Sequence, residues 1–198
     1  RRRVRIAVHA GYGHRRRPDP AGDLGCEARR RLRGDQQRAG QVEVVGSGGP
    51  LAIRLGLMQN SLKPRFREPQ LLLFAADHGL AVDGITGPKG RATHETVHML
   101  LNNQLPLTVF ARAQQLEVTV VDCGMAENMA PHDRLLMRKI AHATRNARLS
   151  PAMSLEQAHA GMRAGMEIGD KLRGNVTIVA GVGVGSHESA ALVLSRLT

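Results

Sequence analysis

Three short apolar segments, each followed by an acidic residue or glycine, constrain the fold of this chain most strongly. They are the stretches 70–76 (QLLLFAA), 117–121 (EVTVV) and 176–180 (VTIVA). The first is too short for a typical helix, and the other two are rich in β-branched residues. Continuous apolar runs of this length are typical of strands buried on both faces of a parallel sheet. Asp77, Asp122 and Gly181 mark where each strand opens into a loop.

Helix-like segments separate these strands. They are expected at about 51–58, 94–102, 106–115, 154–173 and 187–197. The longest begins with a Ser-Leu-Glu-Gln sequence at Ser154, which fits a capping box because the Ser hydroxyl and the Gln side chain can satisfy free backbone groups. Alternating strands and helices predict an α/β fold, a three-layer Rossmann-like domain with a parallel sheet covered on both faces.

The loops at the carboxyl ends of parallel strands lie at one edge of a sheet, where ligands bind in such folds. We therefore expect 77–79, 122–124 and 181–186 to cluster. The last loop reads GVGVGS, and its candidate binding residues are Gly181, Gly183, Gly185 and Ser186. Glycines before a helix let backbone amides approach a phosphate. A tight turn that needs glycine for its dihedral angles explains the same pattern, so both interpretations stay open.

Two further pairs of neighbouring residues have polar side chains that could bind a ligand. Asp77 and His78, followed by Gly79, can orient a general base or hold a ribose hydroxyl, or can form a loop-stabilising hydrogen bond. Arg145 and Asn146 can grip a phosphate or carboxylate through the guanidinium group, and solvated basic surface is the alternative.

The segment His94-Glu95-Thr96-Val97-His98 formally matches the HExxH zinc motif. Thr96 stands where a bulky core residue is expected, and no third histidine follows at the spacing of the extended motif. Histidines on a helix surface are therefore the preferred interpretation. We expect neither a metal nor a cofactor.

Charge and composition limit the other function classes. The net charge of +11 comes mostly from arginines before residue 40, and residues 1–50 have no helical or strand period, which favours an Arg-rich, disordered arm ending near Pro50. Few aromatic residues are available for stacking on bases, which argues against nucleic acid as a partner. No apolar run is long enough for a membrane span or leader, so a cytoplasmic protein is expected, with Cys26 and Cys123 as reduced thiols.

Several segments in this order resemble one family. They are LAIRLGLMQ, LLLFAADHGLAVDGITGPK, LPLTVFARAQQLEVTVVDCGMA, ATRNARLSPAMSLEQAHAGMRAG and GVGVGSHESAALVL. Together they look like the amino-terminal half of nicotinate-nucleotide:dimethylbenzimidazole phosphoribosyltransferase, across about residues 51–198, with AADHG as a specific part. The α/β domain is then incomplete relative to the family.

The resemblance implies a pentosyltransferase of cobalamin biosynthesis, a homodimer that works without metal. Its partners are nicotinate mononucleotide, which donates the phosphoribosyl group, and 5,6-dimethylbenzimidazole, which receives it. By resemblance Gly87, Pro88 and Lys89 would lie near the benzimidazole, and 181–186 near the nicotinate and phosphate. The family's general base, a Glu, lies in the carboxyl-terminal half, so the catalytic residue is unknown here and the activity of this chain is open. A noncatalytic paralogue that binds a nucleotide or azole is the alternative.

Two departures from the family pattern stand out. Gly181 occupies a position where the family usually has Glu. The first fifty residues do not resemble the family, and a shift of reading frame upstream of Leu51 is one hypothesis for them, which sequencing of the encoding DNA tests.

Overall fold

A computed structural model describes residues 4–7, 48–84 and 91–197. Its elements are β1 (Val4–Ala7), α2 (Gly48–Gln59), β2 (Gln70–Ala76), the 3-10 helix η1 (Gly79–Asp83), α3 (Thr93–Leu101), α4 (Pro106–Ala113), β3 (Glu117–Gly124), β4 (Leu135–Met137), α5 (Leu155–Lys171), β5 (Val176–Val182) and α6 (Ser186–Leu197). The predicted strands and helices between residues 70 and 197 are all present, with ends shifted by a few residues.

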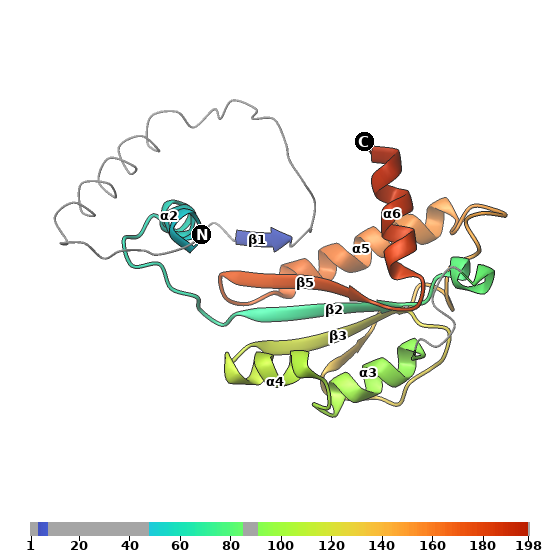
Figure 1. Ribbon diagram of the computed structural model, residues 1–198, viewed down its shortest axis with the longest axis horizontal. Coiled ribbons are helices and arrows are strands. Elements are labelled where there is room, and N and C mark those ends of the chain that lie inside the picture. The colour runs from blue at the N-terminus through green and yellow to red at the C-terminus, as the bar shows by residue number, and fades with distance from the viewer. Residues whose placement is uncertain (1–3, 8–47, 85–90, 198) are drawn as a thin grey trace. The chain divides into compact units, whose positions relative to one another are not determined.

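The strands form one parallel sheet in the order β1-β5-β2-β3-β4 (Figure 1). The three predicted strands make its centre, with β2 between β5 and β3. Phe74 pairs with Val121 on one side and with Gly181 on the other, so the carboxyl ends of these three strands lie side by side. The strands β1 and β4 were not predicted, because runs of four and three residues carry too little pattern.

Alternate residues of β2 face two different cores. Leu71, Leu73 and Ala75 pack in the larger one, together with residues of α3 and α4. Leu72 and Phe74 pack on the opposite face with Ile168 of α5. In Figure 1, α3 and α4 accordingly lie below the sheet, while α5 and α6 lie above it. The three-layer α/β architecture is therefore confirmed.

The predicted capping box is present at the start of α5. Ser154 Oγ accepts a hydrogen bond from the backbone N–H of Gln157 at 3.2 Å, and the Gln157 side chain accepts one from the Ser154 N–H at 2.8 Å. This helix therefore begins where the sequence places it.

Contacts divide the chain into two compact units. One contains residues 1–8 and 67–198, and the other contains residues 9–66. The helix α2 belongs to the second unit and exposes Leu51 and Met58. Most of the Arg-rich segment lies outside the described residues, as do Gly87, Pro88 and Lys89. Within the described ranges, no helix has the length and apolar character needed to cross a membrane.

Candidate functional site

The carboxyl ends of the central strands border a cleft of about 640 Å³. It is lined by residues 181–188 after β5, by Ala81, Val82 and Gly84 at η1, and by Arg91, Thr93 and Thr96 at the start of α3. The predicted glycine turn, with Gly181, Gly183, Gly185 and Ser186, therefore forms one wall of a cleft. This is the position at which ligands bind in open parallel sheets.

Two positions of this turn require glycine, because the chain there passes very close to the end of β2 or adopts a left-handed conformation. A Cβ atom on Gly183 would lie 1.7 Å from the carbonyl oxygen of Ala76, so no side chain fits there. Gly185 has φ +79°, a left-handed conformation that favours glycine, and a Cβ atom there would lie 3.0 Å from the Cβ of His78. The turn thus passes directly over the end of β2, and the local structure needs glycine whether or not a ligand binds.

The same turn also presents backbone donors. The N–H groups of Gly185, His187 and Glu188 have no hydrogen-bond acceptor among the described residues. Unpaired N–H groups and the partial positive charge at the start of a helix such as α6 together favour an anion. The tight-turn interpretation therefore accounts for Gly183 and Gly185, and phosphate binding at the turn stays a prediction.

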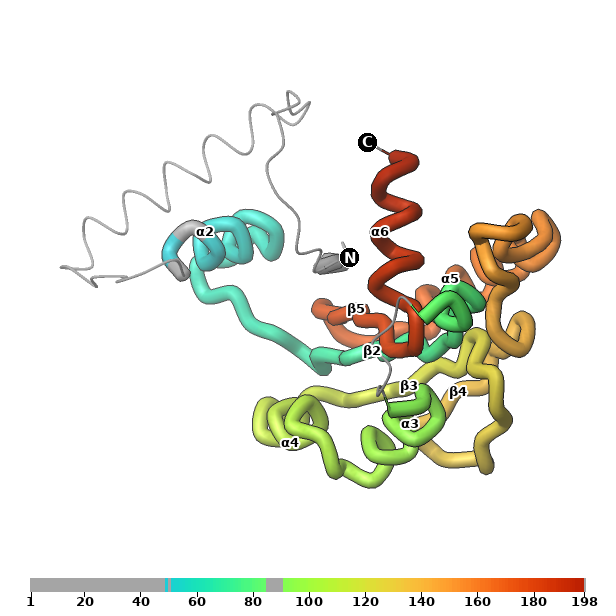
Figure 2. The backbone as a smooth tube through the Cα atoms, turned by 45° about the vertical axis from the view of Figure 1, so that its right-hand side comes forward, coloured from blue at the N-terminus to red at the C-terminus, as the bar shows by residue number. Residues whose placement is uncertain are grey.

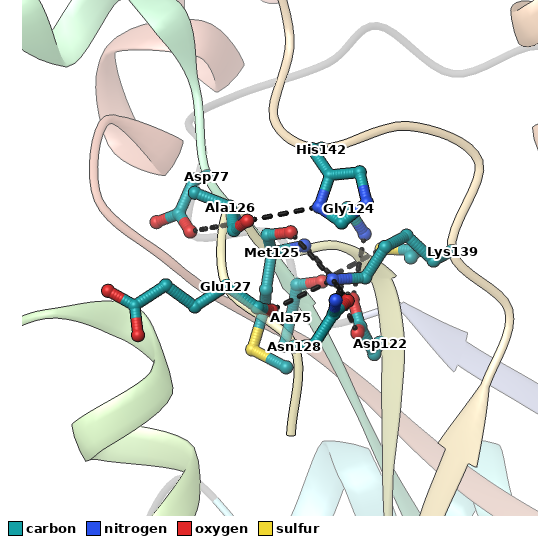
Figure 3. A network of polar contacts seen from close by, with 11 residues as sticks. Ala75, Asp77, Asp122, Gly124, Met125, Ala126, Glu127, Asn128, Lys139 and His142 are labelled. Carbon is teal, nitrogen blue, oxygen red and sulfur yellow. Dashed lines mark hydrogen bonds and ion pairs between the residues drawn. The ribbon is translucent and has the colours of Figure 1, made fainter. Parts of the chain in front are cut away.

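Asp77 holds two of the loops together. Its Oδ1 accepts a hydrogen bond from the Thr93 hydroxyl. Its Oδ2 accepts one from the Ala126 N–H at 2.8 Å, which Figure 3 shows. Thr93 Oγ1 in turn accepts the N–H of Val184 at 3.0 Å. Since both carboxylate oxygens are occupied, Asp77 positions the α3 start and the glycine turn rather than facing the cleft.

His78 lies directly behind the glycine turn. Its backbone N–H donates to the carbonyl of Val184 at 3.0 Å. Burial lowers the pKa of His78 below its ordinary value, against the opposing effect of Asp77 and Glu188. The imidazole is therefore neutral at neutral pH, so it can donate or accept a hydrogen bond without adding a charge to the site.

A buried ion pair supports the loop after β3. Asp122 is fully buried, and its Oδ2 lies 3.3 Å from Lys139 Nζ (Figure 3). Asp122 Oδ1 accepts the N–H groups of Gly124 and Met125 at 3.1 and 3.0 Å. Lys139 also donates to the carbonyls of Met125 and Glu127. This network fixes the Ala126 N–H that binds Asp77.

Other predicted residues lie outside the cleft. Gly79 donates its N–H to Thr144 Oγ1 at 3.1 Å, and a Cβ atom there would clash with the backbone of Arg145. The Arg145 side chain is exposed, and Asn146 donates to Asp83 Oδ2 at 2.9 Å. These residues join the loop after β2 to the segment before α5, but none of them lines the cleft.

The two histidines of the HExxH segment have different neighbours. His94 Nδ1 lies 3.4 Å from Glu127 Oε2, whereas His98 contacts the side chain of Asn102. No group of three or more His, Cys, Asp or Glu side chains is arranged for metal binding within the part of the chain that the structure describes.

Among the residues that line the cleft, sequence reasoning missed Arg91, Thr93 and Thr96 at the start of α3. Thr93 is found only through its contacts with Asp77 and Val184, which lie far from it in the sequence. Arg91 and Glu188 bring charges of opposite sign to the cleft. The place of the GVGVGS turn at the end of a strand could be predicted, but its charged surroundings could not.

A second cleft, of about 660 Å³, lies at the other end of β3, next to Glu117, Val118 and Arg134. Arg134 is already engaged there, with Nη1 donating to Asn103 Oδ1 at 3.0 Å. Since this cleft lies at the amino end of a strand, it lacks the helix start and glycine turn of the first. We therefore take the cleft at the carboxyl ends as the candidate site.

Comparison with known proteins gives a consistent result. A family model described as phosphoribosyltransferase matches residues 26–198. The nicotinate-nucleotide:dimethylbenzimidazole phosphoribosyltransferase of Variovorax paradoxus is 37% identical over 147 residues, which cover 74% of this chain and 42% of the relative. The enzyme of the same name from Aromatoleum aromaticum is 36% identical over 151 residues, covering 75% and 44%.

A solved structure is also similar. The crystal structure of CobT from Thermus thermophilus has a TM-score of 0.76 and 27% identity, and the match covers 88% of this chain and 53% of that one. The chain therefore spans about half the length of the proteins that it matches.

Proposed function

The chain belongs to the nicotinate-nucleotide:dimethylbenzimidazole phosphoribosyltransferase family, and from this premise we propose that its cleft binds nicotinate mononucleotide for transfer of the phosphoribosyl group to 5,6-dimethylbenzimidazole. The observation that carries the proposal is the glycine turn before α6, with three N–H groups that have no acceptor among the described residues. A phosphate monoester satisfies these donors at the start of the helix.

The residues of the cleft suit the remainder of the substrate. Arg91 supplies a cation for the phosphate charge, and Glu188 supplies a carboxylate that can accept hydrogen bonds from ribose hydroxyls. In the proposed reaction the bond from ribose C1′ to the nicotinate nitrogen breaks, and a bond from C1′ to a nitrogen of the azole forms. A base must also take the azole proton. By family resemblance that base is a Glu outside the half that this chain spans, so we propose binding without efficient transfer by this chain alone.

Calorimetric titration with nicotinate mononucleotide, paired with a nicotinate-release assay, tests this proposal. We expect saturable binding and no release above the uncatalysed rate. Arg91→Met removes the cation in the cleft and should weaken binding. Arg163→Met, on the exposed surface of α5, is the matched control and should leave binding unchanged. Absence of binding by the unmodified chain contradicts the proposal.

A noncatalytic paralogue is the second candidate function, and Gly181 favours it because the family usually has Glu there. The structure leaves room for a side chain, since a Cβ atom on Gly181 would approach nothing closer than the Phe74 carbonyl oxygen at 4.0 Å.

We expect Gly181→Glu to fold with an unchanged melting temperature, with Gly181→Gln as the uncharged control. In the presence of the carboxyl-terminal half of a relative, nicotinate release by the unmodified chain supports an enzyme. If, in the same assay, the Gly181→Glu variant releases nicotinate and the unmodified chain does not, the result supports the paralogue.

Three finer expectations belong to the same proposal. The segment with Gly87, Pro88 and Lys89 contacts the azole, the protein is a homodimer, and it acts in the cytoplasm. Light scattering on the purified protein tests the dimer, and cell fractionation tests the location. Chemical-shift changes of these three residues on addition of dimethylbenzimidazole test the azole contact.

A further inference from the structure

The Lys139 ammonium lies inside the loop after β3, where four oxygen atoms surround it (Figure 3). Its Nζ donates to the carbonyl oxygens of Met125 and Glu127 at 2.9 and 2.8 Å. It also donates to Asn128 Oδ1 at 3.1 Å and lies 3.3 Å from Asp122 Oδ2. Because an ammonium group has only three protons, four oxygens are more than it can bond one to one. The arrangement resembles the oxygen shell of a bound cation more than a simple ion pair.

The four oxygens come from one short segment, residues 122–128, which is called the β3 loop below. Carboxylate, carbonyl and amide oxygens together are the ligands of hard cations, and carbonyl oxygens replace the water around a potassium ion. Asp122 supplies the single negative charge of the set, since the Glu127 carboxylate lies instead 3.4 Å from His94 Nδ1. One carboxylate balances one positive charge, so the shell suits a monovalent cation.

The β3 loop is connected to the glycine turn by hydrogen bonds. Ala126 lies between the two residues whose carbonyls bind the ammonium, and its N–H donates to Asp77 Oδ2 at 2.8 Å. Asp77 Oδ1 accepts the Thr93 hydroxyl, and Thr93 Oγ1 accepts the Val184 N–H at 3.0 Å. These contacts lie at the carboxyl edge of the sheet, where in Figure 2 α6 begins above β2 and α3 lies below β3. A change at the ammonium therefore reaches the turn.

We propose that the β3 loop is a monovalent-cation site that the Lys139 ammonium fills from within the chain, and that Lys139 is thereby a positioning residue for the glycine turn. Truncation of the side chain vacates the site without removing any of its four oxygens. A potassium or ammonium ion from solution, which has the same charge and a similar size, then takes the place of the side-chain ammonium.

Lys139→Ala tests this proposal in chloride salts of ammonium, potassium and tetramethylammonium at equal ionic strength. The variant should melt at a lower temperature than the unmodified chain in tetramethylammonium, which is too large for the site and has no N–H group. Replacement of this ion by ammonium should raise the melting temperature saturably, by at least about 3 °C. The backbone amide signals of Ala126 and Val184 should return toward those of the unmodified chain in the same titration.

Two control variants separate site occupancy from other effects of salt. Lys139→Met fills the same space with an uncharged chain, so its melting temperature should not depend on which cation is present. Lys171→Ala, at the exposed end of α5, should behave in the same way.

Equal melting of Lys139→Ala in the three salts overturns the proposal, as does a variant that stays unfolded in ammonium. A rise in melting temperature that leaves the Ala126 and Val184 signals unmoved overturns the positioning role. No nucleotide is present in these measurements, so their outcome is independent of the proposed function.

Discussion

Gly183 shows how tightly the site is built at the scale of single residues. Its position over the Ala76 carbonyl leaves no space for a methyl group, so Gly183→Ala must displace the turn from the end of β2. We expect a loss of at least about 2 kcal/mol in the free energy of unfolding. Gly165→Ala, in α5 with no atom near the added Cβ, should instead stabilise by up to about 1 kcal/mol. Urea denaturation of both variants measures the difference, and equal effects would contradict the structure.

His78 makes the stability of the domain depend on pH. Because burial lowers its pKa in the folded state below the ordinary 6.5, the unfolded chain binds a proton more readily. The free energy of unfolding therefore rises with pH between the folded and unfolded pKa values, and stability is lost as the pH falls through about 6.5.

Denaturation curves between about pH 5 and pH 8 should show a smaller slope for His78→Gln than for the unmodified protein. His159→Gln, on the exposed surface of α5, should keep the slope of the unmodified chain. The interpretation fails if His78→Gln keeps that slope as well.

At the scale of strands and loops, buried polar contacts hold the site together. In the ion pair of Asp122 and Lys139, both side chains are largely buried. Lys139→Met leaves a fully buried carboxylate without its cation and should cost about 3–5 kcal/mol. Lys171→Met, at the exposed end of α5, removes the same charge and should cost little. Thermal or urea unfolding of both variants checks this, and a change below about 1 kcal/mol for Lys139→Met would show that the ion pair is not needed.

The elements themselves follow closely from the sequence, but their contacts do not. The run QLLLFAA could be assigned to a buried strand because it is apolar throughout, and the capping box at Ser154 located the start of α5 from local chemistry alone. In contrast, β4 is too short to show a pattern. Thr93 reaches Asp77 and Val184 only once the strands are aligned, so its role in the site depends on tertiary structure.

For the whole molecule, topology brings together loops that are far apart in the sequence. The parallel order β5-β2-β3 places the loop after each of these strands at one edge of the sheet. This order makes the GVGVGS turn part of a cleft, with Asp77 behind it as an organising residue.

The central claim is that the glycine turn before α6 holds the phosphate of nicotinate mononucleotide, and backbone amide NMR during titration with this nucleotide tests it most directly. We expect saturable shifts at the N–H groups of Gly185, His187 and Glu188, with those of Val118 and Arg134 at the opposite cleft unchanged. Shifts at the opposite cleft, with the glycine turn unaffected, would contradict the account.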